Sequence, residues 1–343
     1  MRDPRPASVV VAEDGVCAAI ERKHVASLLF TYRCTLACAH CLFDCSPRWP
    51  PVRTHTRDAV PWLRQLHATD RIVHVAGGEA MIFWDELLAI CRAAGRAGVA
   101  PHFVETNATF AVRDDVARDR LAALRDAGVA GLLVSSDPYH QRHCPPERTA
   151  RCIRVAREVF GERNVVATEA RIEALEELRA IGRDPERLAE YARRHPPMLV
   201  GRAGDELARH FPDRPVADLL DAAWHGGAGR RDCARELDPA TMWEIHIDPA
   251  GNVQTCCGIV LGNVRETPLP RLMAGGFLGR SPVVDALHAG GPVELLKLAV
   301  DRGYHPRPGY PQKCGMCWEL RRFLRPHFPG TLGPAEIYER DDG

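Results

Sequence analysis

The sequence lacks the features that would point to nucleic acid or a membrane as a partner. Lys plus Arg equals Asp plus Glu, 45 each, so the net charge of the 343 residues is near zero and no polybasic arm is present. Phosphate binding requires clustered positive charge, so nucleic acid is not expected as the main partner. The apolar runs are far shorter than a membrane span. The first residues lack the apolar core of a signal peptide, so we expect a cytoplasmic protein.

Cysteine, in contrast, is abundant, with 13 residues. A reducing compartment disfavours disulfides, so grouped cysteines indicate metal or catalytic sites. They form groups at 34–41, 233–257 and 314–317. The remaining five are interpreted as small apolar fillers or surface thiols: Cys17, Cys45, Cys91, Cys144 and Cys152.

The first group has the spacing C-x3-C-x2-C, formed by Cys34, Cys38 and Cys41. A loop this short can turn three sulfurs toward one point. Iron–sulfur cubes usually take four cysteines, so three would leave one iron open. An open coordination position is what makes a metal site catalytic. The alternatives are a zinc knuckle or three buried cysteines, although zinc sites more often contain two C-x2-C pairs.

This stretch resembles the signature of the radical S-adenosylmethionine (radical SAM) enzymes. The resemblance implies a 4Fe-4S cluster on Cys34, Cys38 and Cys41. It also implies that the amino and carboxylate groups of S-adenosylmethionine occupy the open iron. His40 stands where the family often has an aromatic residue, and imidazole is also flat enough to stack.

The pattern along the chain predicts an α/β fold. Short apolar runs predict strands at 27–33, 71–76, 101–107, 131–137, 164–170 and 198–201, with a short leading strand at 8–12. Helical spacing predicts helices at 56–67, 84–97, 114–127, 146–160 and 184–194. This alternation implies a parallel sheet. With the resemblance, it predicts a partial (β/α)6 TIM-like barrel followed by a small α+β auxiliary-cluster domain.

We expect four segments: a lead-in at 1–26, the barrel at 27–204, the auxiliary-cluster domain at 205–327 and a tail at 328–343. The later part predicts a β-hairpin around the Pro/Gly/Asn turn at 249–252. It also predicts helices at 282–288, 292–301 and 319–324.

Polar motifs fall at the carboxyl ends of three predicted strands, where function gathers in parallel sheets. The first motif is Gly-Gly-Glu at 77–79, and in radical SAM enzymes a Gly-Gly-Glu at this place contacts the amino group of S-adenosylmethionine. The resemblance extends to the motifs at 106–107 and 135–137, whose hydroxyl and carboxylate groups suit a ribose and a methionine carboxylate. Turn formation and helix capping are the alternative. The predicted cofactor-binding residues are Gly77, Gly78, Glu79, Thr106, Asn107, Ser135 and Asp137.

The later cysteines form a second array of four thiols: Cys233, Cys256, Cys314 and Cys317. This array resembles the C-terminal SPASM and Twitch extensions of radical SAM enzymes, and Gly-Arg-Ala at 201–203 resembles the sequence that ends the barrel in such relatives. No cysteine follows Cys317, so the match is to the shorter Twitch form with one auxiliary 4Fe-4S cluster. Cys257 competes with Cys256, which the Gly-x4-Cys spacing favours. A four-cysteine zinc site is the alternative.

The resemblance implies an oxidoreductase that cleaves S-adenosylmethionine to a 5′-deoxyadenosyl radical, which takes a hydrogen atom from the substrate. We expect oxidation or cross-linking of a ribosomally made peptide, with an electron donor such as flavodoxin or ferredoxin. A separate leader-peptide-binding protein is a further possible partner. The alternatives are dehydrogenation of a small-molecule alcohol or aminocyclitol, and a non-catalytic Fe–S or zinc scaffold. Candidate acids or bases, by location alone, are Tyr139, His140, His143, Asp232 and Asp248.

Overall fold

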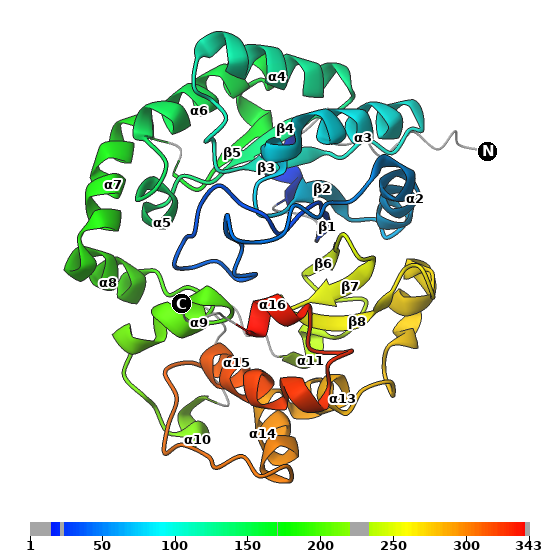
Figure 1. Cartoon of the computed structure of the whole chain (residues 1–343), viewed down its shortest axis with the longest axis vertical. Coiled ribbons are helices and arrows are strands. Elements are labelled where there is room, and N and C mark those ends of the chain that lie inside the picture. Colours follow the sequence, from blue (N-terminus) through cyan, green and yellow to red (C-terminus); the bar gives the residue numbers. More distant parts are fainter. Residues whose placement is uncertain (1–14, 21–23, 170, 220–232, 340–343) are drawn as a thin grey trace. The chain divides into compact units, whose positions relative to one another are not determined.

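The computed structural model describes residues 15–20, 24–169, 171–219 and 233–339 (Figure 1). The strand expected at 8–12 lies outside these residues. Contacts divide the chain into two compact units. The first contains 1–36, 46–184 and 246–251, and the second contains 37–45, 185–245 and 252–343. The division near 184 differs from the boundary expected at 204, and the segment 37–45 clusters with the second unit.

The first unit contains five parallel strands in the order β5-β4-β3-β2-β1 (Figure 1). Their order follows the sequence, as expected when each strand is joined to the next by a helical crossover. The sheet is open, and the predicted α/β class with a parallel sheet is confirmed. The strands are β1 (Val25–Leu29), β2 (Ile72–Ala76), β3 (Phe103–Thr106), β4 (Gly131–Val134) and β5 (Val165–Ala167).

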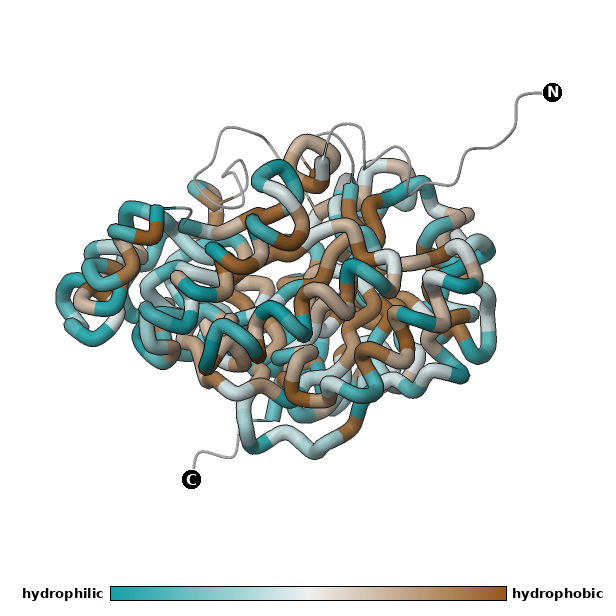
Figure 2. Tube along the Cα trace, turned by 90° about the horizontal axis from the view of Figure 1, so that it is seen from above, coloured by the Kyte–Doolittle hydropathy of each residue, from teal (hydrophilic) through white to brown (hydrophobic). Residues whose placement is uncertain are grey.

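Helices of the first unit cover this sheet through one apolar face. In α2, the buried residues Ala59, Trp62, Leu63 and Leu66 recur every three or four positions. Figure 2 shows the resulting alternation of hydrophobic and hydrophilic colours along the helices. α2 packs on β1 and β2, and α6 packs on β4 and β5. The helices are α2 (Thr56–His67), α3 (Trp84–Arg96), α4 (Asp114–Asp126), α5 (Pro138–Gln141), α6 (Pro146–Phe160) and α7 (Leu175–Arg183), of which α5 and α7 were not predicted.

The strand predicted at 198–201 is wrong, because these residues form no strand. Leu199 and Val200 are buried, which explains the apolar run. The backbone around them is hydrogen-bonded by a side chain, and not by a neighbouring strand. Gln312 accepts from the Leu199 amide at 3.4 Å and donates to the Pro197 carbonyl at 3.1 Å.

The second unit mixes a small sheet with short helices. β7 (Asn252–Thr255) pairs antiparallel with β8 (Ile259–Asn263), which was not predicted. The predicted first hairpin strand is β6 (Glu244–Ile247), whose residues are divided between the two units. Among the described residues the helices are α8 (Pro185–Arg194), α9 (Arg202–Glu206), α10 (Val216–Leu219), α11 (Cys233–Glu236), α12 (Leu269–Arg271), α13 (Pro282–Gly290), α14 (Pro292–Val300), α15 (Lys313–Leu324) and α16 (Ala335–Tyr338).

Residues expected to form a C-terminal tail are part of the second unit. Leu332 forms a bridge with Ile259 of β8 and is fully buried. Tyr338 in α16 is 4% exposed. These contacts make 328–339 a structural part of the four-cysteine region described below.

Candidate cofactor-binding sites

The Gly-Gly-Glu motif after β2 is fixed to the chain that leads into Cys34. The amide of Gly78 donates to the Thr31 carbonyl at 2.7 Å, and that of Glu79 donates to the Arg33 carbonyl at 3.0 Å. A Cβ atom on Gly78 would lie 2.2 Å from the Arg33 oxygen, and one on Gly77 2.6 Å from the Thr31 oxygen. Only glycine allows this approach.

The Glu79 side chain joins the end of β2 to the end of β3. One carboxylate oxygen accepts from the Met81 amide at 3.0 Å and the Thr106 hydroxyl at 2.9 Å. The other accepts from the Asn107 amide at 2.7 Å. Burial raises the pKa of Glu79, and these hydrogen bonds oppose the shift. Three of its roughly four acceptor positions are filled by the protein, so little remains for a ligand.

Asn107 contacts the first cysteine of the predicted cluster loop. Its Nδ2 donates to Cys34 Sγ at 3.5 Å and to the Thr35 hydroxyl at 2.9 Å. The amide of Leu36 also donates to Cys34 Sγ, at 3.3 Å. Two N–H groups directed at one sulfur suit a thiolate ligand, because outer hydrogen bonds orient and tune metal-binding groups. The sequence had placed Asn107 only against the cofactor.

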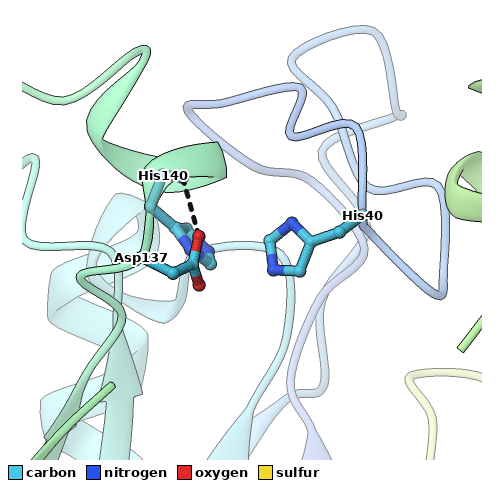
Figure 3. A group of neighbouring side chains, drawn as sticks. All are labelled: His40, Asp137 and His140. Atoms are coloured by element: carbon cyan, nitrogen blue, oxygen red, sulfur yellow. Dashed lines mark hydrogen bonds and ion pairs between the residues drawn. The ribbon is translucent and has the colours of Figure 1, made fainter. Parts of the chain in front are cut away.

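At the end of β4, Asp137 acts as the helix cap that was the alternative to cofactor binding. One oxygen accepts from the amides of Tyr139 and His140 at 2.9 and 3.1 Å, at the start of α5. The other lies 2.8 Å from His140 Nδ1. Figure 3 shows the side chains of Asp137 and His140 next to each other. Ser135 is half-buried, and its amide donates to the Thr106 carbonyl at 2.9 Å. Cofactor binding by Ser135 and Asp137 remains a prediction.

The other acid–base candidates differ in accessibility. Asp248 is 1% exposed and accepts from the Tyr32 hydroxyl at 3.0 Å. Tyr139 is buried and His143 is exposed. Asp232 lies outside the described residues.

Cys38 and Cys41 lie in the segment 37–45, which belongs to the second unit. The Cys41 amide donates to the Cys38 carbonyl at 3.0 Å, and the Cys45 amide donates to Cys41 Sγ at 3.3 Å. A hydrogen bond from the Cys45 side chain, opposed by burial and aided by the charge of Arg202, lowers the pKa of Cys41. A lowered pKa favours the thiolate, which is the form that binds a metal.

Arg202 braces the segment that carries these two cysteines. It is 3% exposed, and its guanidinium donates to the carbonyls of Cys38, Asp44 and Cys45 at 3.0, 2.9 and 2.9 Å. It also forms an ion pair with the Asp44 carboxylate at 2.5 Å. The planar guanidinium can make these contacts at once, which a lysine ammonium cannot.

The backbone of Gly201 and Arg202 explains the glycine of the Gly-Arg-Ala motif. Gly201 has a φ of +59°, in the left-handed region, and a Cβ atom there would lie 2.3 Å from the Leu42 carbonyl oxygen. The Arg202 amide donates to the Cys41 carbonyl at 3.0 Å. The sequence identified this motif by resemblance alone, and the structure shows that it holds the cysteine segment.

The four later cysteines line one cavity of the second unit. They come from α11, the turn between β7 and β8, and the start of α15. α15 begins at Lys313, earlier than predicted, so Cys314 and Cys317 lie three residues apart on one helix face. Apolar side chains complete most of the lining: Met198, Val200, Leu237, Ile259, Leu287 and Pro292.

The turn at Cys256 and Cys257 has an unusual backbone. Both residues have positive φ, 47° and 43°, which is rare for residues with a side chain. Cys256 lines the cavity, whereas Cys257 is buried but is not part of the lining. This placement supports Cys256 as the candidate ligand.

The protonation of the cavity thiols affects how they would bind a metal. Burial raises the pKa of Cys256, Cys314 and Cys317, so metal binding would have to displace their protons. Among the described residues, no three of the four thiols have sulfurs within 4.8 Å of one another.

The first unit is thus an α/β fold in which a glycine-rich turn and Asn107 meet at Cys34, and the second contains a four-thiol cavity. Residues 28–185, just under half of the chain, match the model of the radical SAM superfamily. The chain therefore contains a radical SAM domain.

Solved structures with similarity include BtrN in complex with AdoMet and 2-DOIA, at 12% identity and a TM-score of 0.45, covering 79% of this chain and 88% of that one. They also include native anSMEcpe with bound AdoMet and Cp18Cys peptide, at 11% identity and a TM-score of 0.31, covering 89% and 96%. Native anSMEcpe with bound AdoMet gives 9% identity and a TM-score of 0.32, covering 89% and 97%. No curated protein sequence matches the chain.

Among the described residues, no helix has the length and apolar character needed to span a membrane.

Proposed function

We propose that the protein is a radical SAM oxidoreductase that oxidises or cross-links a ribosomally made peptide. The observation that carries this proposal is the match of residues 28–185 to the radical SAM superfamily, together with the contacts around Cys34. Gly78 and Glu79 bind the chain just before that cysteine, and Asn107 donates to its sulfur.

The residues around the first site fit the implied cofactors. Cys34, Cys38 and Cys41 would hold a 4Fe-4S cluster, with hydrogen bonds already directed at the sulfurs of Cys34 and Cys41. Because the Glu79 carboxylate is occupied, the backbone of the Gly-Gly-Glu turn is the part expected to contact S-adenosylmethionine. When bound, the cluster and S-adenosylmethionine would supply a 5′-deoxyadenosyl radical that takes a hydrogen atom from the substrate.

The second site fits one auxiliary 4Fe-4S cluster. Four cysteines line a single cavity with otherwise mostly apolar walls, and four thiolates are the usual protein ligands of such a cluster. With four protein ligands such a cluster has no open position. It would serve electron transfer, as the acceptor of the electron left on the substrate.

A small-molecule alcohol or aminocyclitol is the second candidate substrate. The cysteine count favours it, because four thiols allow one auxiliary cluster, and this shorter Twitch-like form resembles that of radical SAM dehydrogenases. Mass spectrometry after turnover would separate the two. A loss of two hydrogens from a peptide encoded beside this gene would support the peptide substrate, and the same loss from an alcohol would support the alternative.

The activity is tested with protein purified and reconstituted without oxygen. We expect about eight irons per chain, and 5′-deoxyadenosine after addition of dithionite and S-adenosylmethionine. A variant with Cys34, Cys38 and Cys41 changed to Ala should keep about four irons and form no 5′-deoxyadenosine. A protein that carries zinc, or iron without 5′-deoxyadenosine, would support only the scaffold alternative. A reduced flavodoxin or ferredoxin should replace dithionite, and a leader-binding protein, if one is needed, should be required only with the peptide.

A further inference from the structure

A buried arginine lies at the wall of the four-cysteine cavity. Arg321 is in α15, one turn after Cys317, and is 1% exposed. It lines the cavity together with the four thiols. Burying a charged guanidinium is costly unless negative groups and hydrogen bonds compensate it.

Arg321 is hydrogen-bonded to the turn that carries Cys256 and Cys257. One terminal nitrogen donates to the carbonyls of Cys256 and Cys257, both at 3.1 Å, and to the Tyr338 hydroxyl at 3.4 Å. The guanidinium carbon lies 5.3 Å from the centre of the Trp318 ring. These contacts occupy one side of the guanidinium.

One nitrogen of Arg321 has unused donor capacity. Its Nε is fully buried and makes no hydrogen bond to any described residue. Burial lowers the pKa of Arg321, but its interactions with Tyr338, Cys317, Cys256 and Cys257 raise it more.

Lys313 adds a second cation to the same wall. It lines the cavity at the start of α15, and its charge acts on Cys314 and Cys317. It is only half-buried, so water screens it more than Arg321.

We propose that Arg321, assisted by Lys313, raises the reduction potential of the cluster held by the four cavity cysteines and so makes that cluster an electron acceptor. This inference rests on the proposed function. An iron–sulfur cluster becomes more negative when it is reduced, so a fixed cation beside it stabilises the reduced state. Net charge and hydrogen bonds to the sulfurs are among the factors that set such potentials.

In the proposed reaction, this cluster would accept one electron from the substrate radical. An external one-electron carrier supplies the electron that cleaves S-adenosylmethionine, and the substrate gives a hydrogen atom to the resulting radical. The substrate radical would then lose one proton to water and one electron to a cluster held by the four cavity cysteines. The electron would pass from there to the external carrier, so the substrate would be oxidised by two electrons in total.

The test measures the midpoint potential of the auxiliary cluster by redox titration followed by electron paramagnetic resonance. The full chain with Cys34, Cys38 and Cys41 changed to Ala isolates its signal. At the midpoint of this parent, Arg321→Gln should lower the ratio of reduced to oxidised cluster at least about tenfold, which is about 59 mV for one electron. Arg321→Lys should shift the ratio less, and Lys313→Gln should lower it by a smaller factor.

Arg322→Gln is the matched control, because Arg322 is next in the same helix but 46% exposed and paired with Asp205. It should leave the potential unchanged. The inference fails if Arg321→Gln keeps its iron with an unchanged potential. If Arg321→Gln loses its iron, Lys313→Gln decides, and no shift there overturns the inference. Absence of any cluster in the parent would instead reject the proposed auxiliary cluster itself.

Discussion

Loss of the Arg202 guanidinium should release the segment that carries Cys38 and Cys41. Arg202→Met removes hydrogen bonds of 3.0, 2.9 and 2.9 Å to three carbonyls of this segment, and leaves the Asp44 carboxylate without its partner. Met fills a similar volume, so the change mainly tests charge and hydrogen bonding.

The size of the effect follows from burial. Removing one partner of a buried ion pair costs about 3–5 kcal/mol. Arg202→Lys keeps the charge but loses about two of the three hydrogen bonds, at about 1.5 kcal/mol each, so it should cost about 3 kcal/mol. A cost of 3 kcal/mol is more than about a hundredfold in the population of the opened segment.

Hydrogen exchange of the apoprotein measures this opening directly. The amides of Cys41 and Cys45 are bonded within the segment, at 3.0 Å to the Cys38 carbonyl and 3.3 Å to Cys41 Sγ. We expect peptides that cover 37–45 to exchange about a hundredfold faster in both variants, with β1 to β5 unchanged. Arg209→Met, at an exposed arginine of the same unit, should change nothing.

The reasoning is refuted if exchange of 37–45 in Arg202→Met stays within about threefold of the wild type, since a loss near 3 kcal/mol could not then be present. In the reconstituted protein, the same variant should lose iron from the first cluster to a chelator faster than the wild type. Iron of the auxiliary cluster should be retained.

Three further outcomes are expected. Gly78→Ala, whose Cβ would lie 2.2 Å from a backbone oxygen, should cost about 1–3 kcal/mol in urea unfolding, whereas Gly330→Ala, in open space, should be neutral. Because burial raises the pKa of Glu79, its contribution to stability falls as pH rises above its ordinary value of 4.5. Glu79→Gln should therefore gain Tm relative to the wild type as pH increases from that value, and a pH-independent difference would contradict this. Cys256→Ser should lose about four irons per chain and Cys257→Ser none, and the reverse pattern would reassign the ligand.

The parallel sheet was predictable because its signals are local. The buried strands are short apolar runs, and helices such as 56–67 and 146–160 were predicted with their observed bounds. The wrong prediction of a strand at 198–201 also came from a local signal. An apolar run shows that residues are buried, but it does not show whether a strand or the Gln312 side chain satisfies their backbone.

The cysteine groups were also visible in the sequence, because metal-binding residues must be of particular types at short spacings. Their surroundings were not. Asn107 is 73 residues from Cys34 and Arg202 is 164 from Cys38, and nothing in local spacing indicates either contact. For Asp137 the sequence allowed both a ligand and a helix cap, and the structure shows that its side chain caps α5.

The sequence by itself determined the parallel sheet, most of its helices and the grouping of the four later cysteines, since periodicity and spacing act within a few residues along the chain. Only the tertiary structure decided what each thiol faces. The cavity shared by Cys233 and Cys317, and the cation Arg321 at its wall, depend on packing between elements far apart in sequence. Long-range packing of this kind fixes burial and charge, and these two quantities set how a bound cluster would behave.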